Sequence, residues 1–291
     1  MASAELRLIR RRIRSVQSTK KITSAMELIA ASRIVKASAR VAASQPYTDK
    51  LNEVIANVGA ASGAASHPLL EKREGGTVGV LVVTSDRGLA GAYNSNIIRL
   101  AESRLVALAG ANYRLYLVGK KARTYFNYRG YQIEHTYLGV TDTPAYGDAR
   151  GIANVVIDDF VEGRIDSLEA YTTRFRSALT QVPVQWPLLP IEPPQATEGE
   201  ETVPVGYTYE PSPEEILSRL LPRYVEASIF GMLLEASASE HAARRRAMKA
   251  ATENAEELTK LLTRQANQAR QAEITTEISE IVGGAEALTK G

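Results

Sequence analysis

The segment with the best candidate residues for chemistry is TSDRGLAGAYN, at positions 84–94. It follows the apolar run Val78–Val83 and places Asp86, Gly88 and Gly91 just before a helical pattern. In open α/β sheets ligands bind at the carboxyl ends of the strands, where glycines let the backbone approach a phosphate. The segment matches neither GxxxxGK[ST] nor GxGxxG, so it indicates a nucleotide site only weakly. A tight strand-to-helix turn capped by Asp86 is the stronger interpretation.

Other kinds of catalytic or metal site have little support in the sequence. The chain has no cysteine, which excludes disulfides, thiolate metal sites and cysteine nucleophiles. Its three histidines, His67, His135 and His241, are far apart and lack the spacing of metal ligands. We find no Ser-His-Asp set, no HExxH motif and no paired carboxylates in an apolar setting. We therefore expect this chain to have no catalytic residue and to bind no cofactor or metal.

Charge is unevenly distributed along the 291 residues, although the net charge is only +2. Residues 1–40 carry ten basic and two acidic side chains, a net +8, whereas residues 192–215 carry seven acids and no lysine or arginine. The basic segment could bind nucleic acid, meet an acidic protein or simply face solvent. Residues 1–46 lack the aromatic side chains that stack on bases, which favours an acidic protein partner, with a solvated face as an equal alternative. From the pattern alone, we assign Arg33, Lys36 and Arg40, on the exposed side of the predicted seam, to such a partner.

The N-terminal segment has the pattern of one very long helix. From Leu6 to about Asn57 it contains one proline and no glycine. Apolar residues recur at heptad spacing, which predicts a coiled-coil seam; they are Leu6, Ile9, Ile13, Val16, Ile34, Ala37 and Val41. A second stripe, formed by Ile22, Met26 and Ile29, is displaced from that seam. Such a stripe predicts either a local change of partner or plain drift of the 3.6-residue period.

The C-terminal third also reads as a long helix, with clearer start and stop signals. Ser212 can cap its first turn, and Pro213 suits the first helical position. We expect Pro222 to break or kink the helix near its start, and Gly283 with Gly284 to end it. These signals give a rod too long for the thickness of one ordinary domain.

This second helix has a seam of its own. Along 227–272, ten of fourteen heptad positions are apolar. Three consecutive polar ones, Ser237, His241 and Arg244, indicate a stretch that faces something other than an apolar partner helix. Two long seams so far apart in sequence predict an antiparallel coiled coil made from both ends of the chain.

The middle of the chain predicts an α/β domain. Strands are expected at Val78–Val83, Tyr113–Val118, 132–138 and 167–173, separated by helices at 95–109, 120–128 and 148–162. This alternation implies crossovers and a largely parallel, Rossmann-like sheet. Six prolines between 183 and 204 predict a solvated return to the C-terminal helix. The predicted organisation is a coiled-coil helix at 1–59, an inserted α/β domain at 60–212, and a second coiled-coil helix at 213–291 that pairs with the first.

Four segments resemble the γ subunit of the F-type ATP synthase. They are KKITSAMELIAASRI at 20–34, TSDRGLAGAYN at 84–94, SEHAARRRAMKAATENAEEL at 239–258 and ARQAEITTEISEIVGGAEAL at 269–288. The resemblance extends from about residue 5 to 288 and implies a left-handed antiparallel coiled coil inside a ring of three α and three β subunits. The α/β domain would stand at the foot, beside the ε subunit and the c ring. Proton flow would turn this rotor, and its rotation would drive ATP synthesis in the β subunits.

The same resemblance implies which residues make contacts. The β subunits would be met by Lys20, Lys21 and Met26 and by Arg270, Gln271 and Thr275, whereas the c ring or ε would be met by Tyr207 and Glu210. This favours Lys20 and Lys21 over Arg40 as partners of an acidic β loop.

The resemblance also implies that ATP, ADP and Mg²⁺ are bound by the α and β subunits. Nucleic acid would not be a partner. Contact with the membrane would be indirect, through the c ring. Because the resemblance starts near residue 5, no transit peptide is expected, and the cytoplasmic side of a bacterial plasma membrane is the expected location. Two alternatives are a helical-arm nucleic-acid-binding protein and a nucleotide-using enzyme built on the turn from Gly88 to Gly91.

Overall fold

A computed structural model of the chain describes residues 4–61, 67–73, 76–108, 112–192 and 210–289. The chain divides into two compact units, one formed by Met1–Ala30 with Arg245–Gly291 and the other by Ala31–Arg244. The two terminal helices, α1 (Ala4–Ala61) and α5 (Pro213–Thr289), each contribute residues to both units. The predicted helices at both ends of the chain are therefore confirmed.

The unit Ala31–Arg244 is built around a five-stranded sheet with the order β3-β2-β1-β4-β5. Its strands are β1 (Val78–Val83), β2 (Tyr113–Val118), β3 (His135–Tyr137), β4 (Ser167–Phe175) and β5 (Gln181–Leu189). Strands β1 to β4 pair in parallel, and β5 pairs with β4 in antiparallel fashion. The connecting helices are α2 (Tyr93–Ala107), α3 (Lys120–Tyr128) and α4 (Tyr146–Val161), with a short 3₁₀ turn at Pro68–Leu70. The predicted α/β class and crossovers are confirmed.

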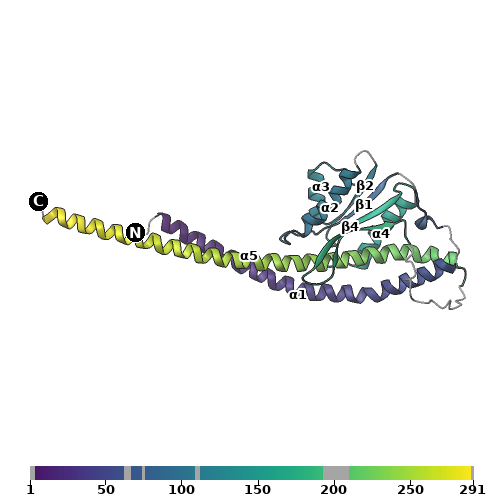
Figure 1. Cartoon of the computed structure of the whole chain (residues 1–291), viewed down its shortest axis with the longest axis horizontal. Helices are drawn as coiled ribbons and strands as arrows, with labels where there is room; N and C mark the ends of the chain where they lie inside the picture. Colours follow the sequence, from purple (N-terminus) through teal and green to yellow (C-terminus); the bar gives the residue numbers. More distant parts are fainter. Residues whose placement is uncertain (1–3, 62–66, 74–75, 109–111, 193–209, 290–291) are drawn as a thin grey trace. The chain divides into compact units, whose positions relative to one another are not determined.

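Each face of the sheet packs against its own set of helices (Figure 1). Val80 and Val82 of β1 point to one face, where they pack with residues of α2 and α3. Leu81 and Val83 point to the other face, where they pack with α4 and with parts of α1 and α5. Side chains of successive strand residues point to opposite faces, so a strand covered on both sides reads as a continuous apolar run.

The antiparallel strand β5 lies where the sequence pattern predicted a solvated return. The strand contains Pro183 and Pro187, which pair in register with Thr173 and Glu169 of β4. Proline cannot donate a ladder hydrogen bond, so within sheets it is confined to edge strands and bulges. β5 is an edge strand, and therefore the prolines are compatible with it.

Two expected interruptions of α5 are not found, a break at Pro222 and an end at Gly283 and Gly284. The helix runs through Pro222 without a break, and Leu221 and Val225 on either side are buried against the core. It also continues past Gly283 and Gly284 to Thr289, and neither glycine has the positive φ of a helix-ending residue. The predicted cap is confirmed, because the Glu215 amide donates to the Ser212 hydroxyl at 3.2 Å.

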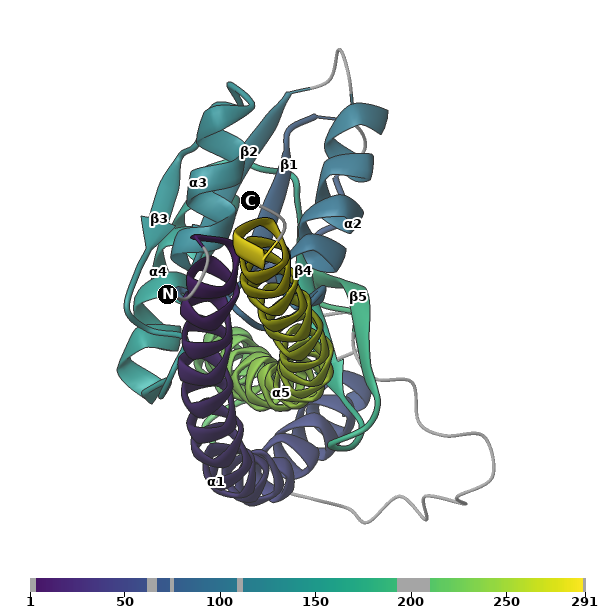
Figure 2. The ribbon, with the colours of Figure 1, turned by 90° about the vertical axis from the view of Figure 1, so that its left-hand side faces the viewer.

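In the other unit, the first half of α1 and the second half of α5 pair in antiparallel fashion (Figures 1 and 2). Lys20 Nζ lies 3.0 Å from Glu256 Oε2, and the Thr23 and Thr252 hydroxyls are 2.7 Å apart. The residue numbers of partners therefore rise on one helix as they fall on the other.

The predicted seams account for most of the buried residues of this pair; an exception is Ala266, which is buried while Gln265 of the predicted series is exposed. At least nine-tenths buried here are Leu6, Met248, Ala255 and Leu262 of the two series, together with Thr23 and Ala30, which lie seven and fourteen residues beyond Val16 and so share its heptad phase. The displaced stripe stays outside the seam, since Ile22 and Ile29 are 60% and 55% exposed. Because Thr23 of the original heptad phase is buried, the seam keeps its register through this region.

Candidate functional site

The glycine-containing turn after β1 is held by its own side chains. The Asp86 carboxylate accepts hydrogen bonds from the backbone amides of Lys120 and Gly139 and from the Thr141 hydroxyl, each at 3.0 Å. Lys120 is the first residue of α3, so Asp86 caps α3, whereas α2 has Ala92 at its cap position. We expected Asp86 to cap the turn that leads into α2. This expectation is wrong, because Asp86 caps α3 instead.

The Asp86 carboxylate bears on anion binding at α3, whereas the glycine turn itself leads into α2. The N-terminus of a helix is a favourable place for a phosphate, and at α3 a carboxylate of the same chain occupies it. Among the described residues, no group of three or more His, Asp or Glu side chains is placed to hold a metal ion.

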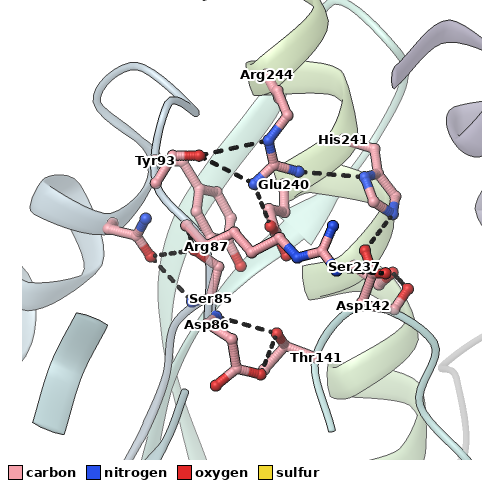
Figure 3. Close-up of polar contacts among 12 residues, drawn as sticks. Ser85, Asp86, Arg87, Tyr93, Thr141, Asp142, Ser237, Glu240, His241 and Arg244 are labelled. Carbon is pink, nitrogen blue, oxygen red and sulfur yellow. Dashed lines mark hydrogen bonds and ion pairs between the residues drawn. The ribbon is translucent and has the colours of Figure 1, made fainter. Parts of the chain in front are cut away.

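A buried arginine of α5 joins the turn to the long helix (Figure 3). The Arg244 guanidinium donates to the Gly88 carbonyl at 3.1 Å and to Glu240 Oε1 at 2.5 Å. About two turns from Arg244 toward the N-terminus of α5, the Tyr93 hydroxyl donates to the backbone carbonyl of Ala236 at 3.2 Å. These contacts fix the β1–α2 connection against one face of α5.

A second set of contacts centres on Asp142, in the loop between β3 and α4 (Figure 3). Arg33 of α1 donates to both carboxylate oxygens, at 2.5 and 2.6 Å. His241 Nε2 lies 3.6 Å from the same carboxylate, and the Ser237 hydroxyl donates to the Asp142 backbone carbonyl at 3.1 Å. We call Arg33, Asp142, Glu240, His241 and Arg244 the polar clamp, because together they connect α1 and α5 to two loops at the end of the sheet.

Burial shifts the proton affinities in the polar clamp. Desolvation lowers the pKa of His241 to about 4, so its ring is neutral at pH 7. Desolvation also raises the pKa of Glu240, although the adjacent Arg244 opposes the change. Burial alone would raise the pKa of Asp142, but hydrogen bonds and charge from Arg33 outweigh it and the pKa falls below its ordinary value.

The polar clamp explains the polar interruption of the C-terminal seam. Ser237, His241 and Arg244 are each at least nine-tenths buried, and they face loops of the α/β domain. The prediction that this stretch does not face an apolar helix is confirmed. The sequence pattern did not identify Asp142, because its partners on α1 and α5 are about 100 residues away in either direction.

Two of the basic residues first assigned to an acidic partner are used within the chain. Arg33 is bound to Asp142, and the Arg40 guanidinium donates to the Pro144 carbonyl. Lys36 is exposed on the same helix. Lys20 also has a partner within the chain, Glu256, whereas Lys21 is exposed.

The predicted contact residues of the coiled coil lie in two separate places. On α1, Lys21 is exposed, Met26 is half-buried and Lys20 pairs with Glu256. The other set, Arg270, Gln271 and Thr275, is exposed on α5. Arg270 lies fourteen residues beyond Glu256, which corresponds to about 21 Å along a helix.

Of the residues predicted to meet the c ring or ε, Glu210 is exposed. Tyr207 lies outside the described residues.

The last turns of α5 extend past the start of α1. The pairing of Lys20 with Glu256 places Ala4 at the level of about residue 272, because the sixteen residues back to Ala4 match sixteen forward on α5. Beyond that level the helix exposes a row of apolar side chains. These are Ile274, Ile278, Ile281 and Val282, with exposures of 47%, 55%, 72% and 58%. An apolar stripe at this helical spacing is typical of a helix face that packs against another surface.

None of the helices in the described part of the chain combines the length and the hydropathy needed to cross a membrane.

Comparisons with known proteins give consistent results along almost the entire chain. A family model described as ATP synthase matches residues 5–288. The ATP synthase gamma chain of Frankia casuarinae is 49% identical over 297 residues, which cover 99% of both chains. The gamma chain of Streptomyces coelicolor is 48% identical over 296 residues, covering 98% of this chain and 96% of that one.

Solved structures show the same fold. A chain in the OSCP/F1/c-ring structure of the Euglena gracilis mitochondrial ATP synthase aligns with a TM-score of 0.69 over 98% of this chain and 94% of that chain, at 18% identity. A chain in the central stalk/c-ring structure of the Tetrahymena thermophila enzyme aligns with a TM-score of 0.59 over 79% of this chain and 99% of that chain, at 23% identity.

Proposed function

This chain belongs to the ATP synthase γ-chain family, and we propose that it is the rotating central shaft of an F-type, proton-translocating ATP synthase. In this role it couples rotation of the c ring, driven by proton flow, to ATP synthesis or hydrolysis in the ring of three α and three β subunits. Its association with the ATP synthase complex follows from the family.

The observation that carries the proposal is the apolar outer surface of the α1–α5 pair. Ile22, Leu28 and Ile29 of α1 are 60%, 69% and 55% exposed, and the end of α5 exposes the row that starts at Ile274. Contiguous exposed apolar patches mark sites of protein–protein contact, and these side chains are the candidates for such a site. A ring of subunits around the helices would cover it on all sides.

The polar clamp gives the proposal a mechanical basis. Rotation imposed on the α/β domain turns the shaft only if both helices are fixed to that domain. Arg33 fixes α1 to the loop that carries Asp142, and Arg244 fixes α5 to the turn at Gly88. Both links join groups that are at least partly buried, so they are less screened by salt than surface ion pairs.

We further propose that the chain contributes no catalytic group. Asp86 fills the position at the N-terminus of α3 where a phosphate would otherwise bind. ATP, ADP and Mg²⁺ would then be held by the α and β subunits, in line with the expectation from sequence.

The proposed partners are the α, β and ε subunits and the c ring, with the membrane reached only through that ring. Lys21 and Met26 on α1, and Arg270, Gln271 and Thr275 on α5, are the proposed β contacts, with Lys20 held beside them by Glu256. Glu210 and Tyr207 are the proposed contacts of the foot with the c ring or ε. We place the assembly on the cytoplasmic side of a bacterial plasma membrane.

Co-expression with the α and β subunits, followed by purification through a tag on this chain, tests the proposal. We expect a stoichiometric complex whose ATP hydrolysis requires this chain. The variant Ile278→Glu should recover less α and β, because it places a charge in the apolar row, whereas Glu280→Gln on the same exposed turn should recover as much as wild type. Recovery of the chain alone, bound to nucleic acid or hydrolysing ATP by itself, would overturn the proposal.

A further inference from the structure

A cavity of about 170 Å³ lies between α1, α5 and the β4–β5 edge, within the unit Ala31–Arg244. Its wall includes Asn52 of α1, Thr172 of β4, Trp186 of β5, and Gly231 and Glu235 of α5. The polar clamp does not contribute to this wall. A cavity of about 150 Å³ is large enough to hold a benzene molecule in other proteins, so this one can hold a small ring compound.

Two polar atoms in the cavity wall are buried without a hydrogen-bond partner among the described residues, Asn52 Oδ1 and Thr172 Oγ1. Thr172 is only 2% exposed. Other hydroxyls of the wall are satisfied within their own helix, since Ser44 donates to the Val41 carbonyl and Thr48 to the Ser44 carbonyl. Buried polar groups in native proteins almost always have partners. Two of the four such atoms in the described part of the chain belong to residues of this wall, where a bound group with hydrogen-bond donors would satisfy them.

Gly231 lies in the cavity wall, where the absence of a side chain leaves space. It lies in the interior of α5, where glycine is less favourable than alanine. A Cβ built at this position would meet no atom within 4 Å, so neither close packing nor backbone geometry requires glycine. Its φ is not positive. A larger residue at position 231 would occupy the space that the cavity provides.

The charges around the cavity favour a cation. Glu235 accepts a hydrogen bond from the Phe175 amide at 2.9 Å and lies 3.7 Å from Arg174 Nε, while the exposed Asp49 adds a second carboxylate to the wall. Arg174 is the basic residue of the wall, and its guanidinium stacks on Trp186 with 4.6 Å to the ring centroid. Apolar atoms of Ala227 and Met232 complete the lining.

We propose that this cavity is a binding site for a small organic cation that carries several N–H donors on a single ring or a group of similar size. The donors would satisfy Asn52 Oδ1 and Thr172 Oγ1, the positive charge would lie near Glu235 and Asp49, and the ring would contact Ala227 and Met232. The site does not depend on the proposed rotary function.

Benzamidinium is a suitable probe, and Trp186 is a built-in reporter because the sequence contains one tryptophan. Titration of the purified full chain, excited at a wavelength that selects tryptophan, should give a saturable change in emission. Benzoate, which has the same shape but a negative charge, should bind at least about tenfold more weakly, since it would face two carboxylates.

Variants of the cavity wall test the location. Gly231→Val should weaken benzamidinium binding by about tenfold or more, because it adds side-chain volume to the cavity wall at a position where the Cβ itself has room. The matched control is Gly151→Val on α4, where a Cβ also meets no atom within 4 Å but the residue is exposed; its affinity should equal that of wild type. Thr172→Val, which keeps the shape and removes the hydroxyl, should weaken binding about two- to tenfold, the range for loss of one hydrogen bond.

Circular dichroism and thermal melting of each variant separate loss of binding from loss of folding. The proposal is overturned if the emission of the wild-type chain does not saturate, if benzoate binds as tightly as benzamidinium, or if folded Gly231→Val binds as tightly as Gly151→Val. A crystal of the chain soaked in benzamidinium that shows only water in the cavity would overturn it as well.

Discussion

Nη1 of Arg33 lies 2.5 Å from one carboxylate oxygen of Asp142 and 2.6 Å from the other, and this contact links the N-terminal helix to the loop after β3. The two residues are 109 positions apart in sequence. Both side chains are about one-third exposed, at 39% and 31%, so solvent screens the pair in part. The contact is the centre of the polar clamp, and the first three predictions concern that region of the molecule.

Replacing Arg33 by Gln should lower the free energy of unfolding by about 1–2 kcal/mol, because Asp142 loses its strongest donor while remaining partly buried. Lys36→Gln, an exposed change one turn along α1, should alter it by less than about 0.5 kcal/mol. Urea denaturation followed by circular dichroism measures both. Equal effects of the two variants would show that the Arg33–Asp142 contact does not stabilise the fold.

His241 should make stability depend on pH below neutrality. Its pKa is about 4 in the folded protein, against an ordinary value of 6.5, so the unfolded chain binds the proton more readily and stability falls as pH drops below 6.5. With these values the loss at pH 5 is about 2 kcal/mol, and it is negligible at pH 7.5.

Comparison with His241→Gln isolates this contribution from the other titrating groups around it, which include Asp142 and Glu240. Wild type should lose about 2 kcal/mol more than the variant when urea denaturation is moved from pH 7.5 to pH 5. Parallel losses in the two proteins would mean that His241 is protonated without cost in the fold.

Asp86→Asn should destabilise the protein by about 2 kcal/mol. The aspartate accepts three hydrogen bonds that connect α3 and the loop after β3 to the turn after β1. An asparagine at this position would present an NH₂ group to some of these donors. Asp158→Asn, an exposed change on α4, serves as the control and should be close to neutral. If both variants melt at the wild-type temperature, Asp86 does not hold these segments together.

Ala255→Trp should disrupt the paired halves of α1 and α5. Ala255 is 7% exposed in the seam, and the indole would be too large for the space between the helices. We expect a loss of about 2 kcal/mol or more, equivalent to a melting temperature lower by about 4 °C or more for a chain of this length. Glu257→Trp, at an exposed position two residues further on, should have little effect on melting. A wild-type melting temperature for Ala255→Trp would remove Ala255 from the seam.

Lys21→Glu should slow ATP hydrolysis by the assembled complex by about two- to fivefold, the range expected when an exposed ion pair is lost. Lys20→Gln should have a smaller effect, because the Lys20 ammonium is already bound to Glu256. Lys36→Glu is the matched control on the same helix. The hydrolysis rate, measured at low and high salt, decides the outcome: a Lys21 effect that does not decline with salt would contradict an electrostatic contact with the β subunits.

The local patterns of the sequence were sufficient to predict the two long helices, four of the strands and the seams between the helices. Strand β5 was missed because its prolines suggest a loop, and only the exposed edge of a sheet makes them compatible with a strand. The glycines at 283 and 284 were interpreted as a stop, yet they stay helical, since glycine allows a helix end without enforcing one.

The candidate site was harder to predict than the fold. The polar positions Ser237, His241 and Arg244 stood out from the heptad pattern, because a seam normally selects apolar residues. Asp142 did not stand out, since its role depends on a long-range contact with Arg33 that no local spacing encodes. The cavity was also invisible in the sequence, because it arises from three elements that meet only in the folded chain.

The edges of the sheet have a consequence for how the molecule behaves when many copies are synthesised together. At one edge β3 has only three residues, and at the other β5 carries two prolines that lack an amide hydrogen. Neither edge offers a long row of donors and acceptors on which a strand from a second molecule could pair. The sheet is therefore protected against intermolecular strand addition, and newly made chains can remain separate and free of β-aggregates until a complex incorporates them.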